Sequence, residues 1–197
     1  RRASDSVALN ISEGSILQSN AEYRKFLGYS IRSLAEVVTC LHKAIRREYL
    51  YKVDFEKYYK DCYALLRESL TAVDGVDALI RRVLGAGKKI CVASQGPHEK
   101  MQLTLGVTGL GDYFTGQIFS ARDVARPKPF PDLFLHAAKS MDAAPHRCCV
   151  IEDSLSGVRA ANAAGMPVIH YAPRGLANGG AIRDIAASVS AMHEIFS

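Results

Sequence analysis

The spacing of apolar residues changes near residue 73. Before that point they recur every three to five positions, which predicts one long amphipathic helix over residues 21–49. A shorter helix is expected over residues 3–12, and Asp54 is expected to cap a further helix that ends near Leu70. The first seventy residues are therefore predicted to be almost wholly helical.

After residue 73, short runs rich in Val and Ile alternate with helical segments. Such runs, each followed by a turn and a helix, are typical of buried parallel strands. The predicted order is helix 76–85, strand 89–93, helix 98–106, a short strand near 117–120, helix 131–140, strand 148–151, helix 155–164 and strand 167–170. The predicted fold class is α/β, with a Rossmann-type doubly wound parallel sheet in residues 71–197 and an α-helical region in residues 1–70.

Composition excludes several classes of protein. The 48% apolar and 23% charged fractions are those of an ordinary globular protein. No run of eighteen apolar residues is present and residues 1–5 lack the apolar core of a secretion signal, so we expect a cytoplasmic protein without a membrane partner. The net charge of +5 is spread among acidic neighbours, which predicts no nucleic-acid partner. The five cysteines form no CxxC pair, so a zinc site is not expected.

The first candidate site residues follow strand 89–93. Ser94 and Gln95 precede Gly96, Pro97 and the expected helix at residue 98. Because ligands of open α/β sheets bind beyond the carboxyl ends of the strands, a hydroxyl and backbone amides here could hold a phosphate oxygen. The alternative is that Ser94 only caps the helix.

Two more candidates carry charge. Glu152 and Asp153 follow strand 148–151, and adjacent carboxylates at such a position suit Mg²⁺, although acidic residues at a helix N-terminus also favour the helix dipole. Lys128 lies between Pro127 and Pro129, which restrict the backbone around it. This rigidity favours an ammonium directed at phosphate and carboxylate charge, whereas a lysine in a loop is otherwise usually a surface charge.

Together these segments resemble three motifs of the haloacid dehalogenase (HAD) superfamily. Residues 92–97 (VASQGP) resemble its second motif, residues 126–132 (RPKPFPD) its third, and residues 150–158 (VIEDSLSGV) its fourth. The resemblance covers residues 73–172 and is nearest to the subfamily of β-phosphoglucomutase-like proteins and sugar-phosphate phosphatases. It implies a Mg²⁺-dependent hydrolase or phosphomutase that acts on a small phosphorylated metabolite.

The resemblance also implies roles for the candidate residues. Ser94 would hold a phosphoryl oxygen together with Gln95, Lys128 would neutralise the phosphoryl group and the nucleophile, and Asp153 with Glu152 beside it would bind Mg²⁺. The family's first motif, an apolar strand ending in Asp-x-Asp, is not found, because no two aspartates in the chain are two residues apart. The resemblance places that strand in the middle of the sheet, so its absence would expose unpaired backbone, and we expect poor solubility, oligomerisation, or another segment in the gap.

Residues 1–70 resemble the four-helix-bundle proteins first noticed in ribosomal-RNA intervening sequences, through the run Asn10-Ile11-Ser12-Glu13-Gly14. This second resemblance implies a homo-oligomer formed through the helical region. Residues 1–70 are then a bundle or cap-like domain, fused to a HAD-like core in residues 71–197. The alternative to an impaired hydrolase is a non-catalytic helical module joined to a degenerate HAD-like domain that binds a ligand or a partner.

Overall fold

The computed structural model describes residues 37, 40–41, 44–49, 51–172 and 185–196. Its contacts divide the chain into two units, residues 1–71 with 103–109 and residues 72–102 with 110–197. The helix expected over residues 3–12 lies outside the described residues, as does most of the helix expected over residues 21–49. Of the latter, residues 37, 40–41 and 44–46 are helical.

The main described element of the first unit is helix α3 (Lys52–Ser69). Its N-cap is Tyr51, which makes no side-chain cap hydrogen bond, so the expected cap at Asp54 is wrong. The helix begins earlier than the sequence suggested, and Asp54 lies inside the first turn, where a carboxylate favours the helix dipole. One side of α3 buries Cys62 and Leu66 against partly buried apolar residues: Val37, Leu41, Tyr59, Tyr63 and Leu70.

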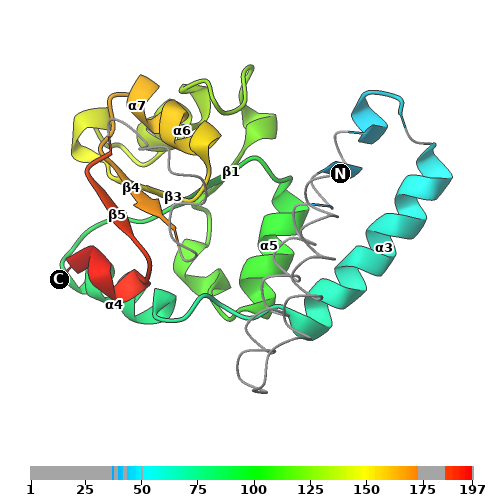
Figure 1. Cartoon of the computed structure of the whole chain (residues 1–197), viewed down its shortest axis with the longest axis horizontal. Coiled ribbons are helices and arrows are strands. Elements are labelled where there is room, and N and C mark those ends of the chain that lie inside the picture. The colour runs from blue at the N-terminus through cyan, green and yellow to red at the C-terminus, as the bar shows by residue number, and fades with distance from the viewer. Residues whose placement is uncertain (1–36, 38–39, 42–43, 50, 173–184, 197) are drawn as a thin grey trace. The chain divides into compact units, whose positions relative to one another are not determined.

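Helices and short strands alternate in the second unit (Figure 1). Its helices are α4 (Val76–Gly85), the start of α5 (His98–Val107), α6 (Asp132–Ser140) and α7 (Leu155–Ala163). Its strands are β1 (Val92–Ser94), β2 (Ile118–Ser120), β3 (Val150–Glu152), β4 (Val168–Tyr171) and β5 (Ala187–Val189). Short 3-10 helices connect them: η1 (Gly111–Phe114), η2 (Ala121–Asp123), η3 (Pro145–Arg147) and η4 (Met192–Phe196). The predicted order of helices and strands is confirmed, and β5 is an addition to it.

Every described strand pair is parallel, as predicted. β1 pairs with β2 in one sheet, and β3, β4 and β5 form a second sheet in that order. Among the described residues no pairing joins β1 to β3, so the strands form two short sheets rather than one continuous sheet. The break lies between the two strands whose carboxyl ends carry the candidate site residues.

Two strands begin later than the sequence predicted. The first, expected over 89–93, starts at Val92, where the backbone amide donates to the Gln117 carbonyl. The third, expected over 148–151, starts at Val150, because the amide of Cys148 is still bonded to the Pro145 carbonyl that closes η3. In both cases pairing with a distant segment, rather than the apolar run itself, decides where the strand begins.

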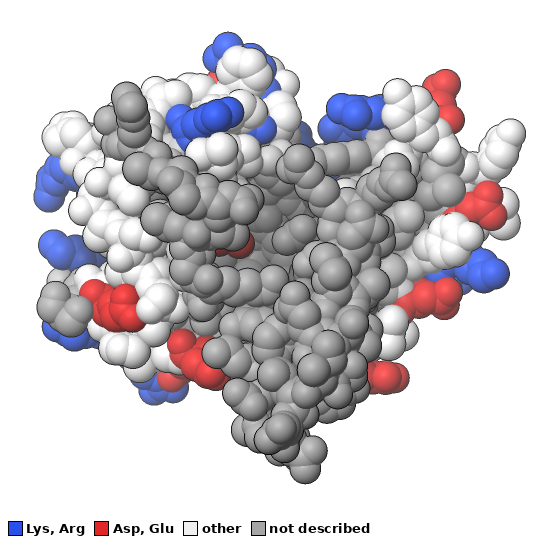
Figure 2. All heavy atoms as spheres, viewed as in Figure 1, with Lys and Arg blue, Asp and Glu red and all other residues white. Residues whose placement is uncertain are grey.

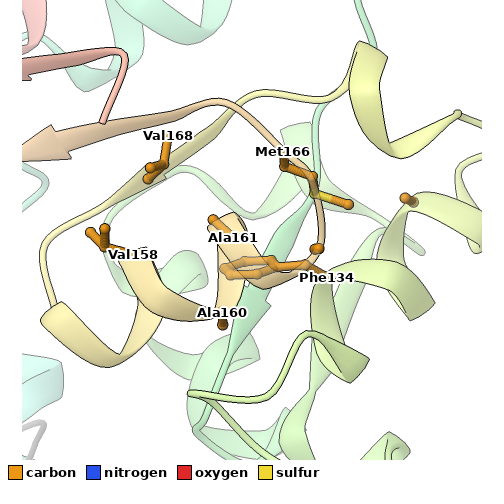
Figure 3. Packing of buried hydrophobic residues seen from close by; sticks show 8 residues of the cluster. Phe134, Val158, Ala160, Ala161, Met166 and Val168 are labelled. Atoms are coloured by element: carbon orange, nitrogen blue, oxygen red, sulfur yellow. The ribbon is translucent and has the colours of Figure 1, made fainter. Parts of the chain in front are cut away.

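Helices α6 and α7 cover the strands. α6 contacts β1 and β2, and α7 contacts β3 and β4. Between them lies a core cluster (Figure 3) of Phe134, Ala138, Val158, Ala160, Ala161, Ala164, Met166 and Val168. Ala93 of β1 and Val150 of β3 both pack against this cluster. The same core therefore packs against one strand of each sheet.

Candidate functional site

A buried ion pair lies where the ends of β1 and β3 come together. Lys128 Nζ is 2.6 Å from Glu152 Oε2, and the two side chains are only 6% and 9% exposed. Lys128 Nζ also donates to the Ala93 carbonyl of β1 at 3.2 Å and lies 4.6 Å from the centre of the Phe134 ring. Lys128 is therefore not a surface charge, and it connects the two sheets.

The second oxygen of Glu152 binds the start of α7. Glu152 Oε1 accepts hydrogen bonds from the Ser154 amide at 3.1 Å and from Ser154 Oγ at 2.7 Å. Ser154 Oγ in turn accepts from the Gly157 amide and caps α7. Burial alone would raise the pKa of Glu152, but the Lys128 ammonium and the Ser154 hydrogen bonds outweigh it and lower that pKa. Glu152 is therefore held as a carboxylate.

Gly157 makes room for this carboxylate. A Cβ atom added to Gly157 would overlap the carboxyl group of Glu152. We expect Gly157→Ala to push Glu152 away from Lys128 and to lower the free energy of unfolding by about 1–3 kcal/mol, as overpacking does in a tight interior. Urea unfolding followed by circular dichroism measures this change.

Gly85→Ala is the matched control for this prediction. Gly85 ends α4, and a Cβ atom added there would meet nothing within 4 Å. We expect this variant to be neutral or slightly stabilised, because alanine loses less backbone entropy in a helix than glycine. Equal losses in both variants would contradict the role given to Gly157.

Ser94 and Gln95 lie at the carboxyl end of β1, as expected from the sequence. Ser94 Oγ accepts a hydrogen bond from the Gly96 amide at 3.1 Å, so it organises the turn before α5. The Ser94 side chain is only half-buried, and Gln95 is partly exposed. This bond lies within the turn before α5, which begins at His98, so it is not the helix cap that was the alternative role for Ser94.

Asp153 follows β3 and is exposed to solvent, unlike its neighbour Glu152. Within the part of the chain that the structure describes, no three His, Cys, Asp or Glu side chains group closely enough to hold a metal ion. Mg²⁺, however, is often bound by one or two carboxylates together with water and substrate phosphate. An exposed carboxylate at the edge of the sheet fits that mode of binding.

The loop that carries Lys128 is held at both ends. Arg126 makes a bidentate contact with Asp132, with Nε to Oδ2 at 3.0 Å and Nη2 to Oδ1 at 2.8 Å. The Arg126 guanidinium also lies 4.8 Å from the centre of the Phe130 ring. Pro131, predicted to be the first helical residue, is instead the N-cap of α6, which begins one position later at Asp132. The prolines of this loop therefore act together with the Arg126–Asp132 ion pair, which was not predicted from the sequence.

A second network links the turns after β1 and β2. His98 Nε2 lies 2.9 Å from Asp123 Oδ1, and Asp123 Oδ2 accepts from the Ser120 amide at 2.7 Å. The buried Ser120 Oγ donates to the Gly96 carbonyl at 2.8 Å. Burial would raise the pKa of Asp123, but the Ser120 amide and His98 lower it. This network was not predicted from the sequence, although the spacing of Ser120 and Asp123 matches a capping box.

The described residues on one face of the molecule form no large area of a single charge sign (Figure 2). In the face that Figure 2 shows, basic and acidic side chains of the described residues are interspersed. Among the described helices, none is both long and apolar enough to cross a membrane.

Known proteins resemble this chain over most of its length. A family model described as haloacid dehalogenase-like hydrolase matches residues 6–165. The chain is 31% identical over 159 residues to 6-phosphogluconate phosphatase of Escherichia coli. This aligned region covers 80% of this chain and 69% of that protein. It is 36% identical over 110 residues to a putative phosphatase of Bacillus subtilis, and this aligned region covers 56% of this chain and 50% of that protein. The chain thus spans only part of each relative.

Solved structures share the fold. CbbY of Rhodobacter sphaeroides, determined in complex with phosphate, matches with a TM-score of 0.68 and 20% identity over 98% of this chain and 88% of that one. A HAD family hydrolase of Deinococcus radiodurans, determined with bound phosphate and sodium, matches with a TM-score of 0.60 and 27% identity over 77% and 69%. These structures confirm the predicted HAD-like α/β fold.

The family match also covers most of residues 1–70, because it begins at residue 6. The resemblance of residues 1–70 to the intervening-sequence bundle, and the fusion that it implied, remain predictions. The motifs quoted for the HAD superfamily lie within the matched residues. The chain belongs to the haloacid dehalogenase-like hydrolase family.

Proposed function

We propose that the second unit binds the phosphate group of a small phosphorylated metabolite together with Mg²⁺, as the core of a HAD-type phosphatase or phosphomutase. The observation that carries this proposal is the buried Lys128 ammonium, held between Ala93 of β1 and Glu152 of β3. A cation fixed at the carboxyl edge of parallel strands is suited to neutralise a phosphoryl group. The net charge of the Lys128–Glu152 pair is zero, so an incoming phosphate would compete with Glu152 for Lys128.

The residues around Lys128 would bind different parts of the ligand, the phosphate oxygens and Mg²⁺. The Ser94 hydroxyl and the backbone amides of the turn at Gln95 would donate to phosphate oxygens. Asp153, with Glu152 beside it, would hold Mg²⁺ directly or through water. When bound, Mg²⁺ would neutralise charge on the phosphoryl oxygens. Glu152 would continue to hold the start of α7 through Oε1, while phosphate would compete with Oε2 for the Lys128 ammonium.

The relatives support a small phosphorylated substrate. The Escherichia coli relative is a 6-phosphogluconate phosphatase, and two similar structures contain phosphate. Because the chain spans only part of these relatives, the substrate class is carried over as a proposal. We propose no particular sugar phosphate.

Turnover by this chain alone should be impaired. The family's first motif supplies the nucleophile, and no Asp-x-Asp occurs in the chain. Without a nucleophile, phosphate binding can persist while covalent transfer to the protein is lost. We therefore expect binding of phosphate esters with little release of phosphate.

The test measures binding and turnover side by side. Isothermal titration calorimetry with inorganic phosphate, with Mg²⁺ or with EDTA, should show binding that weakens at least about tenfold without Mg²⁺ or in Asp153→Asn. Phosphate release from a panel of sugar phosphates and p-nitrophenyl phosphate is recorded on the same samples. Asp112→Asn, a change at an exposed aspartate in η1, is the control and should leave binding unchanged.

Three results are informative. Mg²⁺-dependent turnover would show that another carboxylate acts as the nucleophile, so the expected impairment would be wrong. Phosphate affinity that is unchanged by removal of Mg²⁺ and by Asp153→Asn would favour a degenerate HAD-like domain that binds some other ligand. An absence of phosphate binding in the folded chain would overturn the proposed function.

A further inference from the structure

Lys100 lies in the first turn of α5 and is directed back over the turn that follows β1. A Cβ atom built on Gly96 would lie 3.3 Å from Lys100 Cδ and 3.9 Å from Lys100 Nζ. Side chains of a helix point towards its N-terminus, so a lysine in the first turn covers the residues that precede the helix. The stem of Lys100 therefore packs over Gly96, and its ammonium lies beside the turn at the end of β1.

Gly96 provides the space for this stem. The residue is buried, and it is not among the described glycines that have a positive φ. Its backbone conformation therefore does not require glycine. A side chain at this position would have to share its space with Lys100 Cδ. The absence of a side chain at residue 96 is thus explained by the lysine that lies over it.

The Ser94 hydroxyl lies beside the same point. Ser94 Oγ is 3.6 Å from the position that a Cβ atom of Gly96 would take, so the hydroxyl and the Lys100 ammonium both lie within 4 Å of one place. Ser94 Oγ accepts a hydrogen bond from the Gly96 amide, and a hydroxyl that accepts one bond still has its own proton to donate. A hydroxyl and an ammonium this close can both contact the oxygens of one phosphate group.

Two charged pairs tie the first turn of α5 to η2. His98 Nε2 lies 2.9 Å from Asp123 Oδ1, and Arg122 Nη1 lies 3.4 Å from Glu99 Oε2. η2 directly follows β2, which pairs with β1, so the start of α5 is tied to the sheet that carries the turn. These contacts fix the backbone from which Lys100 extends, and they engage the neighbouring carboxylates on the side of η2.

We propose that Lys100 is a second cationic contact for the phosphate group of the substrate, beside Ser94 and in addition to Lys128. This inference rests on the proposed phosphate-binding function and extends it. The Lys128 ammonium is already paired with the Glu152 carboxylate, so that pair brings no net positive charge to the site. Lys100 adds a positive charge on the Ser94 side, where a compact ammonium can approach a phosphate oxygen as a point charge.

Isothermal titration calorimetry with inorganic phosphate in the presence of Mg²⁺ tests this proposal on the full chain. Lys100→Met removes the ammonium and keeps a long unbranched stem that can still pack over Gly96. Lys100→Arg keeps the positive charge. Lys139→Met, a change at an exposed lysine in α6, is the control with the same loss of charge. The melting temperature of each protein without phosphate is recorded in the same buffer.

We expect Lys100→Met to weaken phosphate binding about ten- to a hundredfold, the loss typical of one hydrogen bond to a charged group. Lys100→Arg should bind phosphate more tightly than Lys100→Met, and Lys139→Met should match the unaltered chain. Without phosphate, the melting temperatures of Lys100→Met and the unaltered chain should agree.

Salt provides a readout that a purely structural role would not change. Sodium chloride screens the attraction between an exposed cation and phosphate. The phosphate affinity of the unaltered chain should therefore fall more steeply with added salt than that of Lys100→Met, which has one positive charge fewer at the site.

Three outcomes would overturn the proposal. Equal phosphate affinity of Lys100→Met and the unaltered chain would exclude the contact and leave the proposed function intact. A weaker affinity that comes with a lower melting temperature, an unchanged salt dependence and no recovery in Lys100→Arg would assign the lysine a structural role. If the unaltered chain itself binds no phosphate, the proposed function fails and this inference fails with it.

Discussion

Replacing Lys128 by methionine is expected to lower the free energy of unfolding of the second unit by about 3–5 kcal/mol. The ammonium and the Glu152 carboxylate are 6% and 9% exposed, so the change leaves a buried carboxylate without its counter-charge. It also removes the hydrogen bond from Nζ to the Ala93 carbonyl, which connects the two sheets. Urea unfolding monitored by circular dichroism gives the loss directly.

Two controls separate the ion pair from the loss of a lysine. Lys139→Met changes an exposed residue in the last turn of α6 and should alter stability by no more than about 0.5 kcal/mol. The double variant Lys128→Met with Glu152→Gln removes both charges and should recover much of the loss, because a neutral amide can still accept from Ser154. A double variant no more stable than Lys128→Met would argue against an uncompensated charge as the cause.

The same pair should make stability depend on pH. The pKa of Glu152 is lowered in the folded chain, so its contribution is present above the pKa of an unfolded glutamate and is lost as the pH falls below about 4. In Lys128→Met, burial would dominate and raise that pKa instead. The difference in stability between the two proteins should therefore shrink as the pH is lowered from 7 towards about 3.

Shortening Leu133 to alanine is expected to cost about 2–5 kcal/mol of unfolding free energy. Leu133 is fully buried in α6, in a cluster with Phe119 of β2 and Ala137. Ala93 of β1 packs against the same cluster, so the cavity would lie beneath the strand that leads to Ser94. Thermal unfolding by calorimetry should show a lower melting temperature and, because the site rests on this cluster, weaker phosphate binding.

Leu135→Ala is the matched control, since it removes the same atoms from the same helix. Leu135 is 39% exposed, and its truncation leaves no enclosed cavity. We expect a change within about 0.5–1 kcal/mol. Similar losses in the two variants would mean that α6 is less firmly packed on β1 and β2 than the structure indicates.

Local pattern in the sequence was sufficient to predict the order of elements in the second unit. Apolar runs and the helical spacing between them predicted α4 over its observed range and the other helices to within one residue. They also placed Ser94 and Asp153 at the ends of parallel strands, because the polar residues follow the apolar runs directly. β5 was not predicted because Ala187–Val189 is not a recognisable apolar run. This segment becomes a strand by pairing with β4.

The partners of the charged residues were decided only by the tertiary structure. The sequence shows Glu152 and Asp153 as equivalent neighbours, but alternation along β3 buries Glu152 against Lys128 and Ser154 and leaves Asp153 in solvent. The break between β1 and β3 is likewise a property of the assembled sheet, since backbone pairing joins segments distant in sequence. Side-chain type and local spacing thus determined which residues reach the edge of the sheet. Burial, which sets the strength of every charge interaction there, depended on the packing of the whole second unit.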